Sequence, residues 1–484
     1  MPLSQLYPQT VWHYFSQLCR IPRPSHHETA VQQFVLDEAQ RLGLHAERDA
    51  VGNVLVRKPA TRGKEHLPCV ILQSHLDMVA QKNHDSTHDF LRDPIQPYVQ
   101  DGWVYARGTT LGADNGIGAA ATLAVLAANN IEHGEIEALF TATEETGMDG
   151  AKGLQGGWLK GSILLNLDTE DLGEICIGCA GGIDGTFSLP INSTQIISGS
   201  PYRLTIRGLK GGHSGIDIVK QRGNAIKIMV QILRTLHKSH AIQIADLQGG
   251  TLRNAIPREA EAVFTSTSDF SVLENQINEL TLKIRATLNK EDQNMIVALE
   301  SSKLPEQVWT HDCQQTILQT LSVAPNGVDS MNPEIAGLVE TSGNLAKAQC
   351  VSGSLNVHYL LRSQNDFARD DLASRLKDLF ELAGGTGELS GTYTGWQPIA
   401  GSPITRLLIQ EGEKLLGKTP EIKVIHAGLE CGILATHYPH WQMASFGPTI
   451  EMPHSPDERV NIESVELFWQ WLVNVLANLA NTTE

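Results

Sequence analysis

Short apolar runs alternate with helix-like stretches over the first 185 residues, and this alternation limits the fold more than any other feature. Four apolar runs occur there: NVLVRK at 53–58, CVILQSH at 69–75, IEALFTATEE at 136–145 and SILLNLDTE at 162–170. Short strands separated by helical segments predict an α/β sheet that contains some parallel strands. Three of the four runs end in acidic or imidazole side chains. Because open α/β sheets bind ligands beyond the carboxyl ends of their strands, these ends are candidate sites.

The segments around the apolar runs predict helices. Residues 8–45 have a helical period that is interrupted by IPRPSHHE at 21–28 and ends at a Gly-containing stop. Further helices are expected over GIGAAATLAVLAANN at 116–130 and GAKGLQGGWLKG at 150–161. The first part of the chain therefore has the order of elements of an α/β domain.

The character of the sequence changes twice along the chain. From about 186 to 392, strand-like runs such as YRLTIRGLKGGHSG are separated by helices such as GNAIKIMVQILRTLHKS, which predicts an inserted α+β domain. The α/β style then resumes with a helix at ITRLLIQEGEKLLG and a strand at WQMASFGP. A chain of this length suggests about two or three domains. We therefore expect one α/β domain in two parts, residues 1–185 and 393–484, around an inserted domain at 186–392.

The charge of the chain argues against broad association with nucleic acids or anionic membranes. There are 37 Lys and Arg residues against 54 Asp and Glu residues, a formal net charge of −17. The N-terminal segment lacks a basic region followed by an apolar stretch, and no segment approaches the roughly 20 apolar residues that span a bilayer. The sequence thus predicts a cytoplasmic protein that acts on small soluble ligands.

The seven cysteines do not have the pattern of a disulfide framework, because their number is odd and they are scattered along a long chain. Cys176 and Cys179 form a CIGC pair, for which redox or zinc chemistry is one interpretation. No second pair accompanies it, so buried thiols beside a Gly-rich turn are the favoured interpretation.

His75 and Asp77 lie two residues apart at the end of the run CVILQSHLD. Residues two apart in an extended segment project to the same side, so both side chains can meet at one point above the edge of a sheet. A metal-binding imidazole and the carboxylate that orients it are often held in this way. The alternative is that Asp77 only caps a turn.

Four further segments carry acidic or imidazole side chains at predicted strand ends or in the loops after them. Taken singly, each has an ordinary explanation: a helix cap, a solvated pair, a strand end and a surface turn. Taken together with His75, they form the nitrogen and oxygen ligand set that zinc and neighbouring divalent metals prefer. The residues are Asp114, the adjacent pair Glu144 and Glu145, Asp168 and His454.

Five segments resemble, in order and spacing, the motif series of the co-catalytic di-zinc peptidases, which include aminoacylases, peptidase T and carnosinases. They are SHLD, LGADNGIG, ATEETGMDGAKGL, NLDTE and MPHSPDER. Within this superfamily, GCAGGIDG, LKGGHSG, LRNAIPRE and HAGLECG are most similar to the bacterial aminoacyl-histidine dipeptidases, also called Xaa-His dipeptidases. The resemblance implies an α/β zinc-peptidase catalytic domain, a mixed sheet flanked by helices, and an inserted α+β lid and dimerisation domain.

The resemblance also implies two divalent metal ions about 3.5 Å apart. Zn²⁺ is expected, with Co²⁺ or Mn²⁺ as alternatives. Asp114 would bridge both ions, His75 and Asp168 would bind one, and Glu145 and His454 would bind the other.

Two acidic residues receive catalytic roles from the same resemblance. Glu144 is the implied general base, which takes a proton from the attacking water and delivers it to the leaving amine. Asp77 would hydrogen-bond the far nitrogen of His75 and fix its tautomer. A cis peptide between Asp114 and Asn115 is also implied.

Three residues of the inserted domain are implied to contact the substrate. His213 would donate a hydrogen bond to the developing oxyanion, Asn254 would make a polar contact, and Arg362 would clamp the free carboxylate. The alternatives are a tight glycine-rich loop around His213 and a solvated strand end at Arg362. In relatives this domain supports homodimerisation, and the sequence leaves open which subunit His213 serves.

The function expected from this resemblance is hydrolysis of unblocked dipeptides with C-terminal histidine, such as carnosine (β-alanyl-histidine). A related aminopeptidase or tripeptidase of other specificity is the nearest alternative. A deacylase of N-acyl amino acids and a catalytically silent peptide-binding protein are the others. The silent protein is disfavoured because it needs neither the ligand set nor the additional base.

Overall fold

The computed structural model describes residues 3–83, 86–196, 198–333, 335–399 and 401–479. Their contacts divide the chain into two compact units. The first comprises the described residues of Met1–Cys179, Trp396–Val424 and Leu429–Glu484, and the second those of Ala180–Gly395 and Ile425–Gly428. The boundaries between the units lie a few residues from those expected from the sequence. The sequence-based division did not include the short segment 425–428, which also belongs to the second unit.

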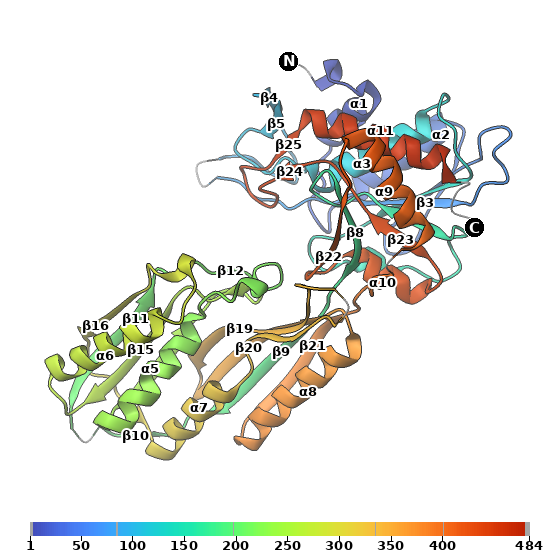
Figure 1. Cartoon of the computed structure of the whole chain (residues 1–484). Helices are drawn as coiled ribbons and strands as arrows, with labels where there is room; N and C mark the ends of the chain where they lie inside the picture. Colours follow the sequence, from blue (N-terminus) through green and yellow to red (C-terminus); the bar gives the residue numbers. More distant parts are fainter. Residues whose placement is uncertain (1–2, 84–85, 197, 334, 400, 480–484) are drawn as a thin grey trace. The chain divides into compact units, whose positions relative to one another are not determined.

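An eight-stranded sheet forms the centre of the first unit (Figure 1), in the order β1-β2-β6-β3-β7-β23-β8-β22. In this sheet β3 pairs parallel with β6 and β7, and β7 pairs parallel with β23. The pairs β1–β2, β2–β6 and β8–β23 are antiparallel. The strands are β1 (His45–Arg48), β2 (Val54–Lys58), β3 (Val70–His75), β6 (Ile136–Thr141), β7 (Ile163–Asn166), β8 (Glu174–Cys179), β22 (Glu421–Ile425) and β23 (Gln442–Ser445).

Strands β3 and β6 are buried along their whole length. This explains their nearly continuous apolar sequence, which is typical of strands covered on both faces. The helices that pack with this sheet into one core are α1 (Gln9–Leu18), α2 (Thr29–Arg41), α3 (Ala113–Ala127), α9 (Pro403–Leu416) and α11 (Ile462–Ala477). A smaller four-stranded sheet has the order β24 (Ile450–Glu451), β25 (Arg459–Asn461), β5 (Trp103–Ala106) and β4 (Pro97–Gln100).

One expected helix is much shorter than predicted. The helix expected over 150–161 is reduced to α4 (Asp149–Gly153). The helix ends because Leu154, the residue after it, has a non-helical backbone with φ −59° and ψ 133°. The prediction was wrong here because a helical period does not reveal this change of backbone conformation.

The second unit contains a nine-stranded antiparallel sheet with helices (Figure 1). Its strand order is β16-β11-β15-β13-β19-β20-β9-β21, with β18 paired to β19. The strands are β9 (Gly181–Pro190), β11 (Ser200–Arg207), β13 (Gln243–Gly249), β15 (Ala260–Ser266), β16 (Ile296–Ser301), β18 (Gly327–Met331), β19 (Val339–Val351), β20 (Ser354–Ser363) and β21 (Thr386–Tyr393). The helices that complete this core are α5 (Ala225–His240), α6 (Phe270–Arg285), α7 (His311–Val323) and α8 (Asp366–Leu382).

These two units confirm the predicted fold class, a mixed α/β unit with an α+β unit inserted into it. None of the helices that the structure describes combines the length and the apolar composition of a transmembrane span. All seven cysteines lie in the described part of the chain, and none of them forms a disulfide. Cys176 and Cys179 are buried, as the favoured interpretation of the CIGC pair expected.

Candidate active site

The carboxyl ends of three parallel strands meet at one edge of the first unit's sheet. His75, the last residue of β3, lies opposite Thr141 at the end of β6, and Gln73 lies opposite Asn166 at the end of β7. This register follows from the parallel pairing and places the segments after the strands side by side. Those segments carry the predicted site residues Asp77, Glu144, Glu145 and Asp168.

Asp114 reaches the same place from the start of α3. The backbone at Asp114 and Asn115 departs from helical geometry, and the peptide bond between them is cis, as the sequence resemblance implied. Glu458 shapes this turn, since its carboxylate accepts hydrogen bonds from four consecutive backbone N–H groups, those of residues 111–114, at 2.7–3.2 Å. Sequence reasoning did not find Glu458, although it lies within the MPHSPDER motif.

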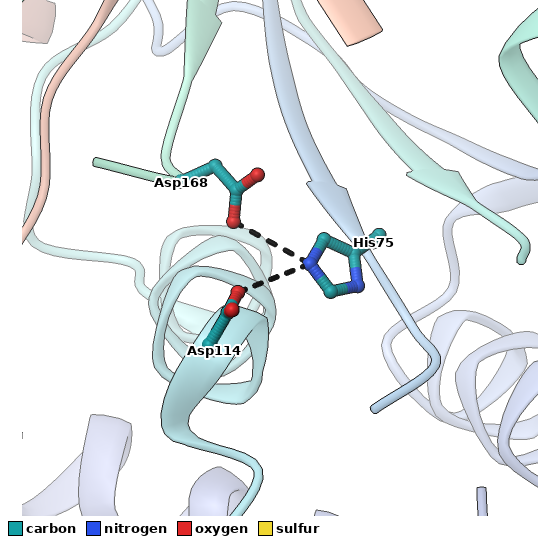
Figure 2. Close-up of side chains that lie close together, drawn as sticks. All are labelled: His75, Asp114 and Asp168. Carbon is teal, nitrogen blue, oxygen red and sulfur yellow. Dashed lines mark hydrogen bonds and ion pairs between the residues drawn. The ribbon is translucent and has the colours of Figure 1, made fainter. Parts of the chain in front are cut away.

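The two carboxylate oxygens of Asp114 face two different imidazoles. Oδ1 lies 3.2 Å from Nε2 of His75, and Oδ2 lies 3.1 Å from Nε2 of His454. Figure 2 shows Asp114 and Asp168 converging on the same His75 nitrogen, and Oδ1 of Asp168 lies 3.5 Å from this Nε2. Asp114 therefore stands between two sets of ligand atoms.

The second set of ligand atoms lies around His454. Oε2 of Glu145 is 3.0 Å from His454 Nε2. Three groups whose ligand atoms lie within 4.8 Å of one another have a composition that could hold a metal ion. They are His75, Asp114 and Asp168; His75, Glu144 and Glu145; and Asp114, Glu145 and His454.

Asp77 connects His75 to the turn that carries the two glutamates. Its Oδ1 lies 3.2 Å from His75 Nδ1 and accepts a hydrogen bond from the backbone N–H of Glu144 at 3.0 Å. Its Oδ2 accepts from the backbone N–H of Glu145 at 3.1 Å and from the Ser25 hydroxyl at 2.8 Å. Burial opposes ionisation of this carboxyl, but the bonds from His75 and Ser25 lower its pKa. An ionised Asp77 thus orients both the imidazole and the adjacent turn.

The electrostatics of this cluster favour cations. Burial raises the pKa of Asp168 to about 7, with Asp114 and Glu145 adding to the effect. Hydrogen bonds from His454 to Asp114 and Glu145 raise the pKa of His454 to about 11. The imidazole is thus drawn into the charged form by surrounding carboxylates. Since a divalent cation would supply positive charge at the same place, the cluster suits metal binding.

Two buried oxygens of the cluster support the same interpretation. Among the described residues, no group donates a hydrogen bond to Oε1 of Glu145 or to Oδ1 of Asp168, whose contact with His75 Nε2 at 3.5 Å is an ion pair only. Buried carboxylate oxygens are normally hydrogen-bonded or bound to metal, because leaving them unsatisfied is costly. The residues present therefore fit the binding of divalent metal.

Glu144 differs from the other carboxylates of the cluster because no ion pair holds it among the described residues. Burial raises the pKa of Glu144 well above its ordinary value, and the charges of Asp168 and Glu145 contribute in the same direction. A carboxylate in such surroundings is a stronger base than one in water.

A buried polar network lies beneath the cluster and was also missed by sequence reasoning. The fully buried Glu430 accepts hydrogen bonds from Gln73 Nε2 at 2.6 Å and from Thr141 Oγ1 at 2.7 Å. Gln73 in turn accepts one from Asn166 Nδ2 at 2.5 Å. Glu430 begins α10 (Glu430–His437). It belongs to HAGLECG, a motif that contributed to the family resemblance but to no predicted site residue.

His213, in the second unit, has a defined tautomer. It lies in β12 (Gly212–His213), which pairs with β14 (Ala255–Ile256), the strand that follows Asn254. Nδ1 of His213 accepts hydrogen bonds from the backbone N–H groups of Gly215 at 3.2 Å and Ile216 at 3.1 Å. In the neutral imidazole the proton is therefore on Nε2, which makes that nitrogen a donor.

Arg362, also in the second unit, is a buried residue of β20 and not the solvated strand end of the alternative interpretation. Its Nη1 donates to the Tyr393 hydroxyl at 2.7 Å. Ser342, its cross-strand partner on β19, hydrogen-bonds Nε2 of His426 at 2.7 Å. Burial, together with the charges of Arg362 and His213, lowers the pKa of His426 to about 3. Sequence reasoning assigned no role to His426 or Tyr393, although His426 is the first residue of the HAGLECG motif.

Comparison with known proteins agrees with this arrangement. The chain is 46% identical over 479 residues to the cytosol non-specific dipeptidase of Escherichia coli, covering 99% of both chains. It is 45% identical to the aminoacylhistidine dipeptidase of Vibrio alginolyticus, whose crystal structure it matches with a TM-score of 0.90 over 98% of both chains. Bacillus cereus aminopeptidase PepT shares the fold at 17% identity, with a TM-score of 0.57 over 98% of this chain and 99% of the other.

The family assignment rests on the greater part of the chain. Residues 71–478 match the Peptidase family M20/M25/M40. This range includes every acidic and imidazole residue of the site described above. The chain is a peptidase that belongs to the family M20/M25/M40.

Proposed function

We propose that this chain is a metal-dependent dipeptidase that hydrolyses unblocked dipeptides, preferentially Xaa-His dipeptides such as carnosine. The position of Asp114 between two imidazoles, with an additional buried glutamate beside them, carries the proposal. The names of the two relatives that are 46% and 45% identical support dipeptides as substrates. The preference for histidine is supported by the Vibrio relative's name alone.

Five residues would hold two divalent ions, Zn²⁺ being expected and Co²⁺ or Mn²⁺ being the alternatives. Asp114 would bridge them, His75 and Asp168 would bind the first, and Glu145 and His454 the second. Such ions lower the pKa of a bound water and polarise the carbonyl that is attacked.

Glu144 would act as the general base, and Asp77 would orient His75 and the turn that carries Glu144. Glu144 accepts a proton from the attacking water and later donates it to the leaving amine, for which its raised pKa is suited. Asp77 holds the tautomer of His75 and, by accepting the N–H groups of Glu144 and Glu145, holds both glutamates in place.

The second unit would bind the substrate. The Nε2 proton of His213 is suited to donate to the oxyanion, and Arg362 to bind the C-terminal carboxylate of the dipeptide. Asn254 would make a polar contact to the substrate. A longer C-terminal extension would move the free carboxylate out of reach of Arg362, which would restrict the enzyme to short peptides.

We also propose a cytoplasmic location and a homodimeric assembly. The name of the Escherichia coli relative, cytosol non-specific dipeptidase, supports the location. The resemblance to dimeric di-zinc peptidases supports the assembly, in which no nucleic acid or membrane takes part.

A substrate panel with metal-free protein and defined added metal tests the proposal. The panel contains Xaa-His and Xaa-Gly dipeptides, tripeptides and N-acetylated amino acids. We expect activity only with added divalent metal, two ions bound per chain, and the highest kcat/KM for Xaa-His. A higher kcat/KM for tripeptides would favour the related tripeptidase, and one for N-acetylated amino acids would favour the deacylase. Binding without turnover of any compound would favour a silent binding protein.

A further inference from the structure

A row of four residues crosses four adjacent strands of the second unit's sheet. Arg362 of β20 lies opposite Ser342 of β19 on one side and opposite Gly182 of β9 on the other. Gly182 in turn lies opposite Tyr393 of β21. Directly paired residues project to the same face of a sheet, so these side chains share one surface.

Gly182 allows its two neighbours in this row, Arg362 and Tyr393, to meet. Arg362 and Tyr393 are two strands apart, yet Nη1 of Arg362 donates to the Tyr393 hydroxyl at 2.7 Å. A Cβ atom at Gly182 would lie 2.5 Å from the Tyr393 ring and from its hydroxyl oxygen. The phenol ring therefore lies over the glycine, in space that any side chain at this position would occupy.

Arg362 is buried without an acidic partner. Its side chain is 5% exposed, its Nε has no acceptor, and no carboxylate of the described residues forms an ion pair with it. Asp184, two residues along β9 from Gly182, forms its ion pair with Arg253 at 3.7 Å, and the charge of Arg362 acts on the pKa of Asp184 without such a pair. Arg369 shows the usual arrangement, because it is equally buried but bonds Asp366 at 2.7 Å.

Among the described residues, the only hydrogen-bond acceptor of this buried guanidinium is a neutral hydroxyl, so the guanidinium has unused capacity for an anion. The neutral hydroxyl holds one end of the guanidinium without neutralising it. On the other side, the Ser342 hydroxyl is engaged with His426 at 2.7 Å, and the imidazole there adds no negative charge.

We propose that Tyr393, given its place by Gly182, is the positioning residue that aims the Arg362 guanidinium at the α-carboxylate of the substrate. This inference rests on the proposed function, and it assigns the selection of free C-terminal carboxylates to the pair Tyr393 and Gly182. Tyr393 fixes the angle of the guanidinium, and Arg362 supplies the charge.

The test compares Tyr393→Phe with the parent enzyme on dipeptides and on the same dipeptides as C-terminal amides. The substitution removes one hydroxyl and leaves the ring. We expect KM for free dipeptides to rise about 10-fold, which is the size of effect of one hydrogen bond to a charged group, with kcat nearly unchanged. Amides, which lack the carboxylate, should keep their parental KM.

Gly182→Ala is the second variant, because it leaves both Arg362 and the hydroxyl intact but takes the space of the ring. It should reproduce the KM increase. Tyr359→Phe is the matched control, because Tyr359 lies on the same strand as Arg362 and its buried hydroxyl has no hydrogen-bond partner in the part of the chain that the structure describes. This control should leave KM unchanged for both acids and amides.

The outcomes separate this inference from the proposed function. A parent enzyme that hydrolyses no dipeptide would overturn the proposed function, and equal parental KM values for acids and amides would overturn the Arg362 clamp. A parent that prefers acids, combined with folded Tyr393→Phe and Gly182→Ala variants of parental KM, would overturn the positioning role alone.

Discussion

Replacement of Asp77 by Asn should lower activity about 10- to 100-fold while most of the metal remains bound. The carboxylate makes four contacts, two on each oxygen: with His75 Nδ1 and the Glu144 N–H on Oδ1, and with the Glu145 N–H and the Ser25 hydroxyl on Oδ2. Asn has the same shape but only one acceptor oxygen and no charge. The substitution therefore tests the contacts without creating a cavity.

The size of the effect follows from what an amide can replace. If the oxygen of the introduced amide faces His75 and Glu144, the amide nitrogen faces Ser25 and the Glu145 N–H. The Ser25 hydroxyl can turn and accept, but the Glu145 N–H loses its acceptor. A donor left unsatisfied costs about 1–3 kcal/mol, which corresponds to roughly 5- to 150-fold in an equilibrium or rate constant. Loss of the charge behind His75 adds to this, in the range of about 10- to 100-fold found for residues that support metal ligands.

Steady-state kinetics on a dipeptide, together with metal analysis of the same samples, measures both parts of the prediction. Ser25→Ala is the control, because it removes one hydrogen bond to Asp77 but keeps the carboxylate, and we expect only a few-fold loss of activity. Parental kcat/KM in Asp77→Asn would refute the orienting role and return Asp77 to a turn cap. Complete loss of metal would instead make Asp77 a ligand.

Three further predictions concern catalysis, metal content and acid stability. Glu144→Gln should lower kcat by about 10²- to 10⁴-fold with both ions retained, whereas the activity of Glu145→Gln should be partly rescued by excess metal; the same rescue in both variants would refute Glu144 as the base. Asp114→Ala should lose more metal than Glu145→Gln, because a bridge serves both ions; metal analysis showing two tight ions in Asp114→Ala would contradict the bridge. His426, with a pKa of about 3 in the folded protein and about 6.5 when unfolded, binds more protons in the unfolded state between these values, so the free energy of unfolding falls as pH drops from about 6.5. The free energy of unfolding, measured with urea at pH 6.5 and 4.5, should therefore fall less in His426→Gln than in the parent, by up to about 2 kcal/mol. An equal decrease in both proteins would refute the assignment of a neutral buried imidazole.

Much of the first unit could be predicted from local sequence. The apolar runs ending at His75 and Thr141 are buried strands because continuous apolar segments are stable only when both faces are covered. The same reasoning placed His75 and Asp168 at the carboxyl edge of the sheet. Local reasoning failed at 150–161, where the backbone leaves helical geometry at Leu154, a change that a helical period does not reveal.

The ligand set was predicted from residue types, but its geometry was decided by tertiary structure. Asp114 faces His75 and His454 because α3 begins at the sheet edge, and Glu458 holds that turn from 344 residues away along the chain. Nothing in the local pattern of either segment encodes this contact. Likewise Glu430 lies beneath the cluster only because α10 packs there.

The surroundings of Arg362 depend still more on the fold. The sequence resemblance indicated an arginine at this position, but it gave no role to Gly182 or His426, which lie in its motifs, or to Tyr393, which does not. Antiparallel pairing places β19, β20, β9 and β21 side by side, in an order that differs from their order in the chain, and this brings Gly182 and Tyr393 to Arg362. His426 joins them through its hydrogen bond with Ser342 of β19. Side-chain type and strand burial are local properties and can be read from the sequence, whereas cross-strand register and the pairing of distant charges exist only once the chain has folded.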